Sequence, residues 1–419
     1  MTCTHLLDTD TAPFGVLRLP RSILVGSNQR QALAHIAREF GSSALICTDA
    51  RLAASDELHE IVTALKQQSM TVEVYGETEA ELPVPGIMAC VDGLRERRID
   101  VVIGVGGGSC MDMAKVVSVL LTHGGEPSDY YGEFAVPGPV LPVIAVPTTA
   151  GTGSEVTAIA VVSDPKLGMK MGISSPHIIP AVAVCDPSLT LTCPPALTAA
   201  TGADAFVHLV ESYTAIARQG TPELARERVF IGRNPLTDSI ALEGIRLVGR
   251  SLVTAYREPG NDKARGDMMV AALYGGMALS NAGTAAAHAI QYPVGALTHT
   301  PHGVGVGLLL PYVLRHNFPA IQPQLARIAE ALGKDTRDLA VADAARAGIE
   351  AVDDILAAIG IPSTLADLGV QEGDLDRIAE LSQNSKRLID NNPVPLDLAG
   401  LTAITRAAFE GDRSFRSCH

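Results

Sequence analysis

The sequence feature that most constrains the fold is a change of pattern near residue 193. From residue 21 to about residue 190, short apolar runs alternate with longer stretches of helical periodicity. Strands of four to eight residues separated by helices of ten or more indicate βαβ units and a parallel sheet covered on both faces. The predicted strands are Ser43–Thr48, Thr71–Val74, Val101–Val105, Val140–Val146 and Ala181–Cys185, and predicted helices between them include Gln29–Phe40 and Gly86–Arg98.

The strand pattern ends at Cys193-Pro194-Pro195, because proline interrupts regular structure and restricts the residue before it. A chain of 419 residues also exceeds the size at which a single hydrophobic core usually stops growing. We therefore expect an α/β domain with a Rossmann-like parallel sheet over residues 1–192 and an all-helical domain over residues 193–419. The helices predicted after the break are Leu197–Arg218, Pro235–Tyr256, Ala264–Ser280, Ala285–Gly295, Leu325–Leu332, Val341–Ile359 and Leu375–Leu381.

The composition excludes several classes of function. A formal net charge of −14 repels phosphate groups, so neither nucleic acid nor an anionic membrane is expected as a partner. The N-terminus lacks a signal-peptide pattern, and the apolar runs are far shorter than the roughly 20 residues of a membrane span. Seven cysteines are scattered without a CxxC pair. This usage predicts reduced, mostly buried thiols in a cytoplasmic protein.

A glycine-rich turn, Gly106-Gly107-Gly108-Ser109, follows a predicted strand and precedes a predicted helix. Glycines let the backbone approach a ligand, and the new helix directs unpaired N–H groups at it, which suits a pyrophosphate. A plain structural turn is the alternative, because glycine-rich turns are common. Asp112 and Lys115 extend the pattern to GGGSxxDxxK, which is much rarer than three glycines alone.

Two more predicted strands end in polar groups. The segment PTTAGTGSE, residues 147–155, offers hydroxyls and glycines for phosphate and ribose contacts, although a polar loop is an alternative. Asp49 follows another strand, where a carboxylate can bind ribose hydroxyls and repel a 2′-phosphate, favouring NAD over NADP. Asp49 precedes the glycines, whereas the usual dinucleotide fingerprint has its acidic residue after them, and aspartate is also an ordinary helix N-cap.

A carboxylate and three imidazoles form the candidate metal site. Asp204 and His208 are four residues apart on the first helix after the two prolines, so both project from one face. His288 lies in another predicted helix, and His302 lies in a predicted turn, Thr300–Gly303. This donor set suits Fe(II) or Zn(II). A single histidine would more often be structural, so the metal interpretation depends on the combination.

Four segments, in this order, resemble the hallmark segments of iron-containing alcohol dehydrogenases: GGGSCMDMAK, VPTTAGTGSEVT, DPSLTLTCPPALTAATGADAFVHLVE and HAIQYPVGALTHTPHGVGVGLLLP. The resemblance covers about residues 20–320. It implies a dehydroquinate synthase-like architecture with an N-terminal NAD-binding domain and a C-terminal metal-binding and substrate domain. It further implies hydride transfer between a small alcohol, or its aldehyde or ketone, and NAD, with Fe(II) or Zn(II). We also expect a homodimer.

The resemblance assigns roles to individual residues. Asp204, His208, His288 and His302 fall on the four metal-ligand positions of the family. The residues on or beside its cofactor-binding positions are Asp49, Gly107, Gly108, Ser109, Thr148, Thr149, Thr152, Thr157 and Lys170.

Two departures from the family pattern concern the site. Tyr292 stands where members commonly carry a second histidine that aids proton transfer, so Tyr292 and His299 become the candidate proton relays. Tyrosine at this position also resembles the hydroxyacid–oxoacid transhydrogenase branch, whose activity is the alternative function. The sequence Glu81-Leu82-Pro83-Val84 replaces an Asn-Pro-Thr segment that contacts the cofactor.

The architecture alone does not define a single reaction. Dehydroquinate synthase-like or glycerol phosphate chemistry uses the same fold, although the Asp-x3-His and TPHG patterns speak against it. A non-catalytic protein that keeps the fold would bind neither metal nor cofactor. Arginines crowd the stretch Arg218–Asn234, and we interpret them as a solvated surface rather than an anion site.

Overall fold

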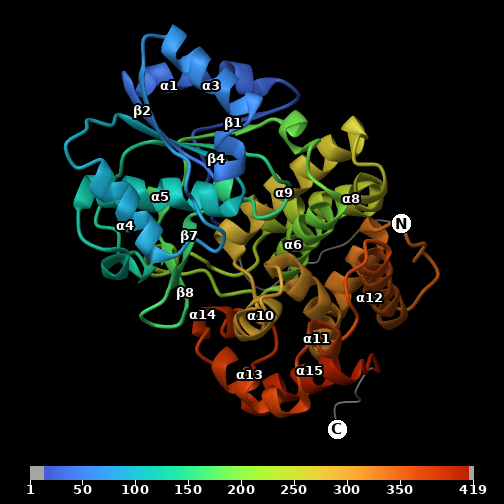
Figure 1. Ribbon diagram of the computed structural model, residues 1–419. Coiled ribbons are helices and arrows are strands. Elements are labelled where there is room, and N and C mark those ends of the chain that lie inside the picture. Colours follow the sequence, from blue (N-terminus) through green and yellow to red (C-terminus); the bar gives the residue numbers. More distant parts are fainter. Residues whose placement is uncertain (1–13, 415–419) are drawn as a thin grey trace. The chain divides into compact units, whose positions relative to one another are not determined.

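The computed structural model describes residues 14–414. The chain divides into two compact units. One, here called the sheet unit, comprises Arg18–Cys193, and the other, the helical unit, comprises residues 14–17 and 194–414. Figure 1 colours the sheet unit from blue to green and most of the helical unit from green to red.

A six-stranded sheet forms the centre of the sheet unit, in the order β1-β9-β6-β4-β2-β3, and every neighbouring pair is parallel. β3 lies on one side of β2, whereas β4 returns to the other side, so the strand order reverses between β2 and β4. Ligands of open parallel sheets bind at the carboxyl ends of the strands beside such a reversal. The strands are β1 (Ser22–Val25), β2 (Ser43–Cys47), β3 (Thr71–Tyr75), β4 (Val101–Gly106), β6 (Val143–Pro147) and β9 (Val182–Cys185).

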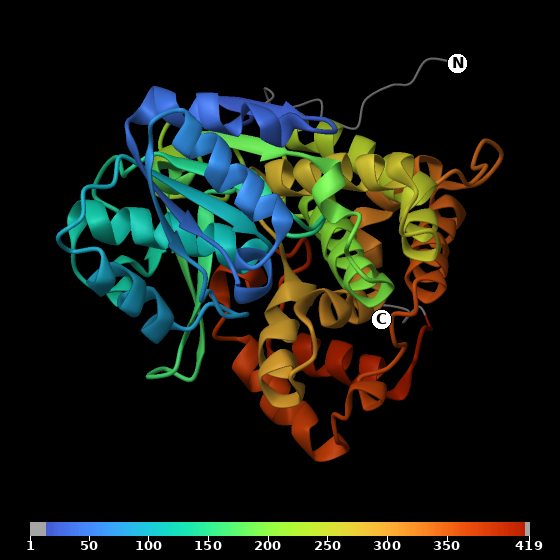
Figure 2. The ribbon, with the colours of Figure 1, turned by 45° about the horizontal axis from the view of Figure 1, so that its top comes forward.

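Both faces of this sheet are covered by helices, which is why its central strands read as continuous apolar runs. Ala44 and Ile46 pack on one face with residues of α1 and α3, and Leu45 and Cys47 pack on the other with residues of α4 and α5. Figures 1 and 2 show these two pairs of helices on opposite sides of the strands. The helices are α1 (Leu33–Phe40), α2 (Ala50–Ala53), α3 (Asp56–Gln67), α4 (Val84–Gly93) and α5 (Gly108–His123).

Several strands were not predicted from the sequence. They are β1 and a second sheet in which β5 (Gly132–Glu133), β8 (Met169–Ser174) and β7 (Ile159–Asp164) lie in that order. β7 and β8 form an antiparallel hairpin whose turn ends at Gly168, with φ 65°. The strand predicted from Val140 begins only at Val143, because Pro142 lacks the N–H that a central strand donates.

The helical unit is built from helices, as predicted, with α6 buried along nearly its whole length. α6 packs against α8, α9 and α11, so it is surrounded by other helices. The helices are α6 (Pro195–Thr214), α7 (Leu224–Glu227), α8 (Pro235–Arg257), α9 (Asp262–Ala282), α10 (Ala286–Thr298), α11 (His302–Ala331), α12 (Val341–Ala358), α13 (Leu375–Ser382), α14 (Lys386–Ile389) and α15 (Leu398–Glu410).

The largest departure from prediction in this unit is α11. Only Leu325–Leu332 was predicted, whereas the helix has 30 residues and contains Pro311, Pro319 and Pro323. Prolines inside a helix remove hydrogen bonds and bend the axis. α11 accordingly has a non-helical residue at Ile321, between two of the prolines, with φ −125° and ψ 19°.

The described cysteines are all free thiols, and four of the five are buried, in agreement with the prediction of reduced thiols. They are Cys47, Cys90, Cys110, Cys185 and Cys193, whereas Cys3 and Cys418 lie outside the described residues. Between residues 14 and 414, no helix has the length and apolarity required to cross a bilayer.

Candidate metal centre and dinucleotide site

Three helices of the helical unit carry the four predicted metal ligands (Figure 1). Asp204 and His208 lie one turn apart on α6, and His288 is the third residue of α10. His302 was predicted in a turn, and this is wrong: it is the first residue of α11, preceded by Pro301 as the N-cap. Proline has a backbone conformation compatible with the entry to a helix, so the TPHG segment, which follows the end of α10, leads into α11.

The four side chains converge on one carboxylate oxygen. Oδ1 of Asp204 lies 3.4 Å from Nε2 of His208, 3.7 Å from Nε2 of His302 and 3.9 Å from Nε2 of His288. Ligand atoms around a tetrahedral ion with bonds of about 2.1 Å are about 3.4 Å apart. The spacing therefore leaves room for one transition-metal ion among these atoms.

Burial and protonation also fit a metal. Asp204, His208 and His288 are 4%, 6% and 4% exposed. Nε2 of His288 has no hydrogen-bond partner among residues 14–414, which is costly for a buried polar atom unless an ion or water completes it. Burial and the neighbouring His208 lower the pKa of His288 to about 3, against the opposite effect of Asp204. The imidazole is therefore neutral, the form that binds metal.

Ligand atoms of Asp204, His288 and His302 all lie within 4.8 Å of one another. His208 joins this group through its 3.4 Å approach to Asp204 and through its ring, which stacks on His288 with centroids 5.0 Å apart. The structure thus brings together all four residues from two stretches of the sequence, 204–208 and 288–302, that are 80 residues apart.

The close approach of α6 and α11 depends on Gly303. A Cβ atom at this position would lie 1.9 Å from the carbonyl oxygen of Ala200 and 3.0 Å from Cβ of Asp204. No other residue type fits there without moving one of the two helices. Gly303 therefore places His302, its neighbour, within reach of Asp204.

The two proton-relay candidates occupy different environments. The ring of Tyr292 lies 6.2 Å from the ring of His302, with an interplanar angle of 26°. This position agrees with its spacing of one helical turn from His288. His299 is the C-cap of α10, in the left-handed region with φ 56°, and its side chain is exposed.

A buried carboxylate that was not predicted from the sequence also belongs to this site. Glu211 lies on α6 and contacts Nδ1 of His288. Burial raises the pKa of Glu211 to about 7, although hydrogen bonds from Ala285 and Ala287 act in the opposite direction. Glu211 follows Asp204 by seven residues, which is about two helical turns. This spacing is the signal in the sequence that predicts the two carboxylates on the same face of the helix.

Seven of the nine predicted dinucleotide residues lie after the carboxyl ends of β2, β4 and β6 in the six-stranded sheet. α5 begins at Gly108 with Gly107 as its N-cap, directly after β4. A Cβ atom on Gly108 would lie 2.8 Å from Cγ2 of Thr152, and one on Gly107 would lie 3.6 Å from Oγ1 of Thr149. The loop after β6 therefore packs directly against the glycine turn after β4. Asp49 follows the adjacent β2, and Ser109 and Thr148 complete the set at this edge.

Lys115 stabilises the loop after β6 through hydrogen bonds in the interior of the sheet unit. Its side chain is fully buried, and Nζ donates to Oγ of Ser154 at 2.7 Å, to Oγ1 of Thr157 at 2.9 Å and to the carbonyl of Ile159 at 2.8 Å. Burial lowers the pKa of Lys115, and Asp112 acts to raise it. Thr157 is 2% exposed with its hydroxyl held by Lys115, so the structure gives it a place in the support of the loop.

Asp49 and Lys170, the remaining predicted cofactor residues, each have a local partner. Oδ1 of Asp49 accepts from the N–H of Leu52 at 2.9 Å and so caps α2. Lys170, on β8, forms an ion pair with Glu81. Glu81 belongs to the segment that stands in place of the family's Asn-Pro-Thr.

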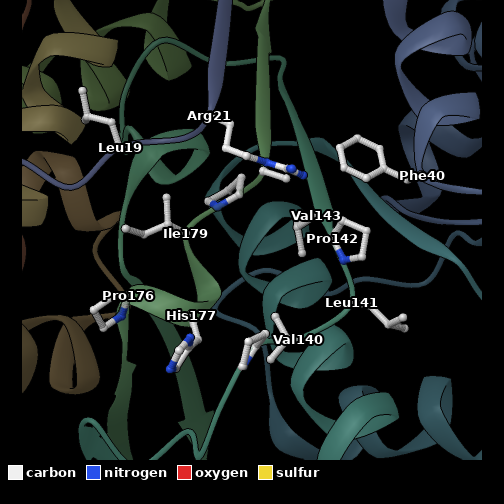
Figure 3. Close-up of a pocket in the computed structure, with 13 residues that line it drawn as sticks. Leu19, Arg21, Phe40, Val140, Leu141, Pro142, Val143, Pro176, His177 and Ile179 are labelled. Carbon is white, nitrogen blue, oxygen red and sulfur yellow. The ribbon is translucent and has the colours of Figure 1, made fainter.

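An open hollow of about 420 Å³ lies at the opposite edge of the sheet, near the amino ends of β6 and β9 (Figure 3). It is lined mainly by apolar groups, and the guanidinium of Arg21 lies 5.3 Å over the ring of Phe40. None of the predicted site residues lines it.

Comparisons with known proteins identify the family of the chain. The family model for iron-containing alcohol dehydrogenase matches residues 20–187, and the model for the C-terminal part of the family matches residues 198–409. The chain is 35% identical to the long-chain-alcohol dehydrogenase 1 of Geobacillus thermodenitrificans over 384 residues, covering 91% of this chain and 93% of that protein.

Solved structures give the same result. A crystal structure of 1,3-propanediol oxidoreductase matches with a TM-score of 0.88 and 33% identity, covering 94% of this chain and 100% of that chain. The sulfoacetaldehyde reductase of Bifidobacterium kashiwanohense, solved in complex with NAD⁺, matches with a TM-score of 0.81 and 28% identity, covering 95% and 99%. The chain therefore belongs to the iron-containing alcohol dehydrogenase family, and it is a metal-dependent oxidoreductase that transfers hydride between an alcohol, or the corresponding carbonyl compound, and NAD.

Proposed function

We propose that Asp204, His208, His288 and His302 hold the catalytic metal, Fe(II) with Zn(II) as the alternative, through one carboxylate oxygen and three Nε2 atoms. The observation that supports this proposal is the 3.4–3.9 Å spacing of the three Nε2 atoms from Oδ1 of Asp204. Mixed imidazole and carboxylate ligands suit both ions.

The dinucleotide site is proposed at the edge where β2, β4 and β6 end. Gly107, Gly108 and Ser109 present the N-terminus of α5 to the pyrophosphate, since a 16-residue helix directs its first N–H groups there. Thr148, Thr149 and Thr152 supply hydroxyls from the adjacent loop. Asp49 accepts hydrogen bonds from the ribose hydroxyls. Thr157 and Lys170 stabilise the loops around these cofactor contacts.

In the reaction, the metal supplies a Lewis acid for the substrate oxygen when bound, and NAD supplies the hydride acceptor. The chain's own task is to place the substrate and to move its proton. We propose that the hydroxyl of Tyr292, whose ring lies beside His302, transfers the proton of the substrate oxygen. A phenol hydroxyl can donate a proton, so Tyr292 serves as the donor when the carbonyl compound is reduced. His299 is the second candidate.

The substrate class is proposed from the relatives, which include enzymes named for 1,3-propanediol and for methanol. We propose a small alcohol or diol. NADH formation by the Fe(II)- and Zn(II)-loaded protein, measured with short diols, hydroxy acids and primary alcohols, tests this. Exchange between a hydroxy acid and an oxo acid without net NADH release would instead identify the transhydrogenase activity.

The metal assignment is tested with His302→Ala, which should lose most bound metal and all activity while its cooperative unfolding persists. His316→Ala is the matched control, because His316 lies on the same helix but outside the four-residue cluster. Full metal content and turnover in His302→Ala would refute the assignment.

We further propose a cytoplasmic homodimer. The free thiols of the described cysteines support the compartment. Light scattering after size-exclusion chromatography should give twice the mass of one chain.

A further inference from the structure

Glu211 occupies a position in the core of the helical unit that packing alone does not explain. It lies on α6, three residues after His208 and seven after Asp204, and it is 2% exposed. Burying a carboxylate is costly unless hydrogen bonds replace its water. The carboxylate must therefore have partners that compensate for its removal from solvent.

Two backbone N–H groups and one ring nitrogen fill this role, all from one short segment. Oε2 accepts from the backbone N–H of Ala285 at 2.8 Å and lies 2.6 Å from Nδ1 of His288, and Oε1 accepts from the backbone N–H of Ala287 at 2.7 Å. The two backbone groups can only donate. Each carboxylate oxygen thus accepts a backbone N–H, which favours the ionised form. An ionised carboxylate can only accept, so it also requires the proton of His288 to be on Nδ1.

That proton position determines what the other nitrogen of His288 can do. With Nδ1 protonated, Nε2 of the neutral ring carries the lone pair. Nε2 lies on the side of Asp204, 3.9 Å from Oδ1, and has no hydrogen-bond partner in the described part of the chain. The hydrogen bond of Glu211 thus presents a lone pair to the space that the other ligands surround.

The same carboxylate also fixes the backbone beneath the ring. Ala285, the N-cap of α10, makes no side-chain cap bond, and its N–H and that of Ala287 are among the groups that a helix leaves unpaired at its start. Glu211 satisfies both and adds a negative charge at the positive end of the helix. One side chain therefore sets both the start of α10 and the orientation of the ring that α10 carries.

We propose that Glu211 is a positioning residue of the metal centre, which holds His288 as the Nδ1–H tautomer with Nε2 directed at the ion and thereby sets the metal affinity. This inference depends on the proposed metal site. Partners of this kind typically change metal affinity by about 10- to 100-fold when they are removed.

The test uses Glu211→Gln, because glutamine has the same shape but only one acceptor oxygen. Whichever way its amide turns, an NH₂ group faces either Ala287 or the pair of Ala285 and His288. We expect the dissociation constant for Zn(II) and for Co(II), measured on the metal-free protein by competition with a chromophoric chelator, to rise by about 10- to 100-fold. The visible absorption of the Co(II) form should change with it.

Asn234→Ala is the matched control for a purely structural role. Asn234 is a buried N-cap of α8 in the same unit, and its loss removes helix-cap hydrogen bonds without touching a ligand. The control should unfold at a lower temperature yet bind metal as the wild type does. If Glu211→Gln behaves in the same way, with a dissociation constant within twofold of the wild type, Glu211 is only a helix cap and the inference is overturned.

The tautomer supplies a readout that needs no metal. Nitrogen NMR of ¹⁵N-histidine-labelled metal-free protein should place the proton of His288 on Nδ1 in the wild type, and a proton on Nε2 would overturn the inference. If Glu211→Gln does not fold, Glu211→Asp, which keeps the charge but retracts it by one carbon, takes its place in the affinity measurement with the same criteria. A wild type that binds no metal at all would refute the proposed site itself, whereas equal affinities would refute only the role of Glu211.

Discussion

Gly303→Ala is expected to disable the metal centre by separating two helices rather than by removing a ligand. The added Cβ would lie 1.9 Å from the carbonyl oxygen of Ala200, and Cβ contacts below 3.0 Å are essentially never seen. The start of α11 must therefore move away from α6 by at least about 1.1 Å. Neither side can yield alone, because the Cβ is attached directly to the backbone of α11 and the carbonyl oxygen of Ala200 belongs to the backbone of α6. His302, the preceding residue, moves with it.

A displacement of this size exceeds what a metal site tolerates, since ligand distances are held within about 0.2 Å. We expect metal affinity to fall by at least the 10- to 100-fold that is typical of disturbing an outer partner of the ligands. Overpacking should also lower the free energy of unfolding by about 1–3 kcal/mol. Metal content by mass spectrometry, thermal unfolding of the metal-free protein and NADH formation measure the three effects.

Gly307→Ala is the control, because Gly307 lies one turn further along α11 and also faces α6. Its Cβ would lie 3.1 Å from Cβ of Ala203, a contact that small shifts relieve, so metal content should be preserved. If Gly303→Ala bound metal and turned over substrate as the wild type does, the argument that Gly303 sets the approach of His302 would be refuted.

Three further predictions concern separate parts of the chain. Asp49→Asn keeps an acceptor that can cap α2 but removes the negative charge. The ratio of kcat/KM for NADPH to kcat/KM for NADH should therefore rise about tenfold, equivalent to about 1.4 kcal/mol. An unchanged ratio would mean that other residues determine the cofactor selectivity. Tyr292→Phe should lower turnover by about a hundredfold and alter its pH profile, whereas His299→Asn should not; the reverse result would transfer the relay to His299. Burial raises the pKa of Glu155 to about 7, although Lys115 acts to lower it. The pKa of glutamate in the unfolded chain is near 4.3. Between these two pH values the folded state therefore holds a proton on Glu155 that the unfolded chain has lost. The free energy of unfolding should therefore fall by about 3 kcal/mol as pH rises from about 4.3 to 7, and denaturant titrations of Glu155→Gln should show a flatter dependence over this window.

The sequence by itself determined the elements whose patterns are local. β2 and β4 were predicted nearly to the residue, because strands buried on both faces read as continuous apolar runs between turns. Asp204 and His208 were predicted on one helical face, because a spacing of four residues has a fixed meaning in a helix. The family resemblance added which distant histidines to combine with them.

Only the tertiary structure decided features that depend on neighbours far apart in the sequence. α11 was missed because its three prolines argue against a helix locally, while packing against α6 and α12 stabilises it. The hairpin of β7 and β8 was missed because its alternation is weak without the partners that bury one face. Neither the 1.9 Å constraint at Gly303 nor the hydrogen bond between His288 and Glu211 has a local signature. Both arise where separate helices meet, and a sequence pattern records the face of a helix but not which residue of another helix lies opposite.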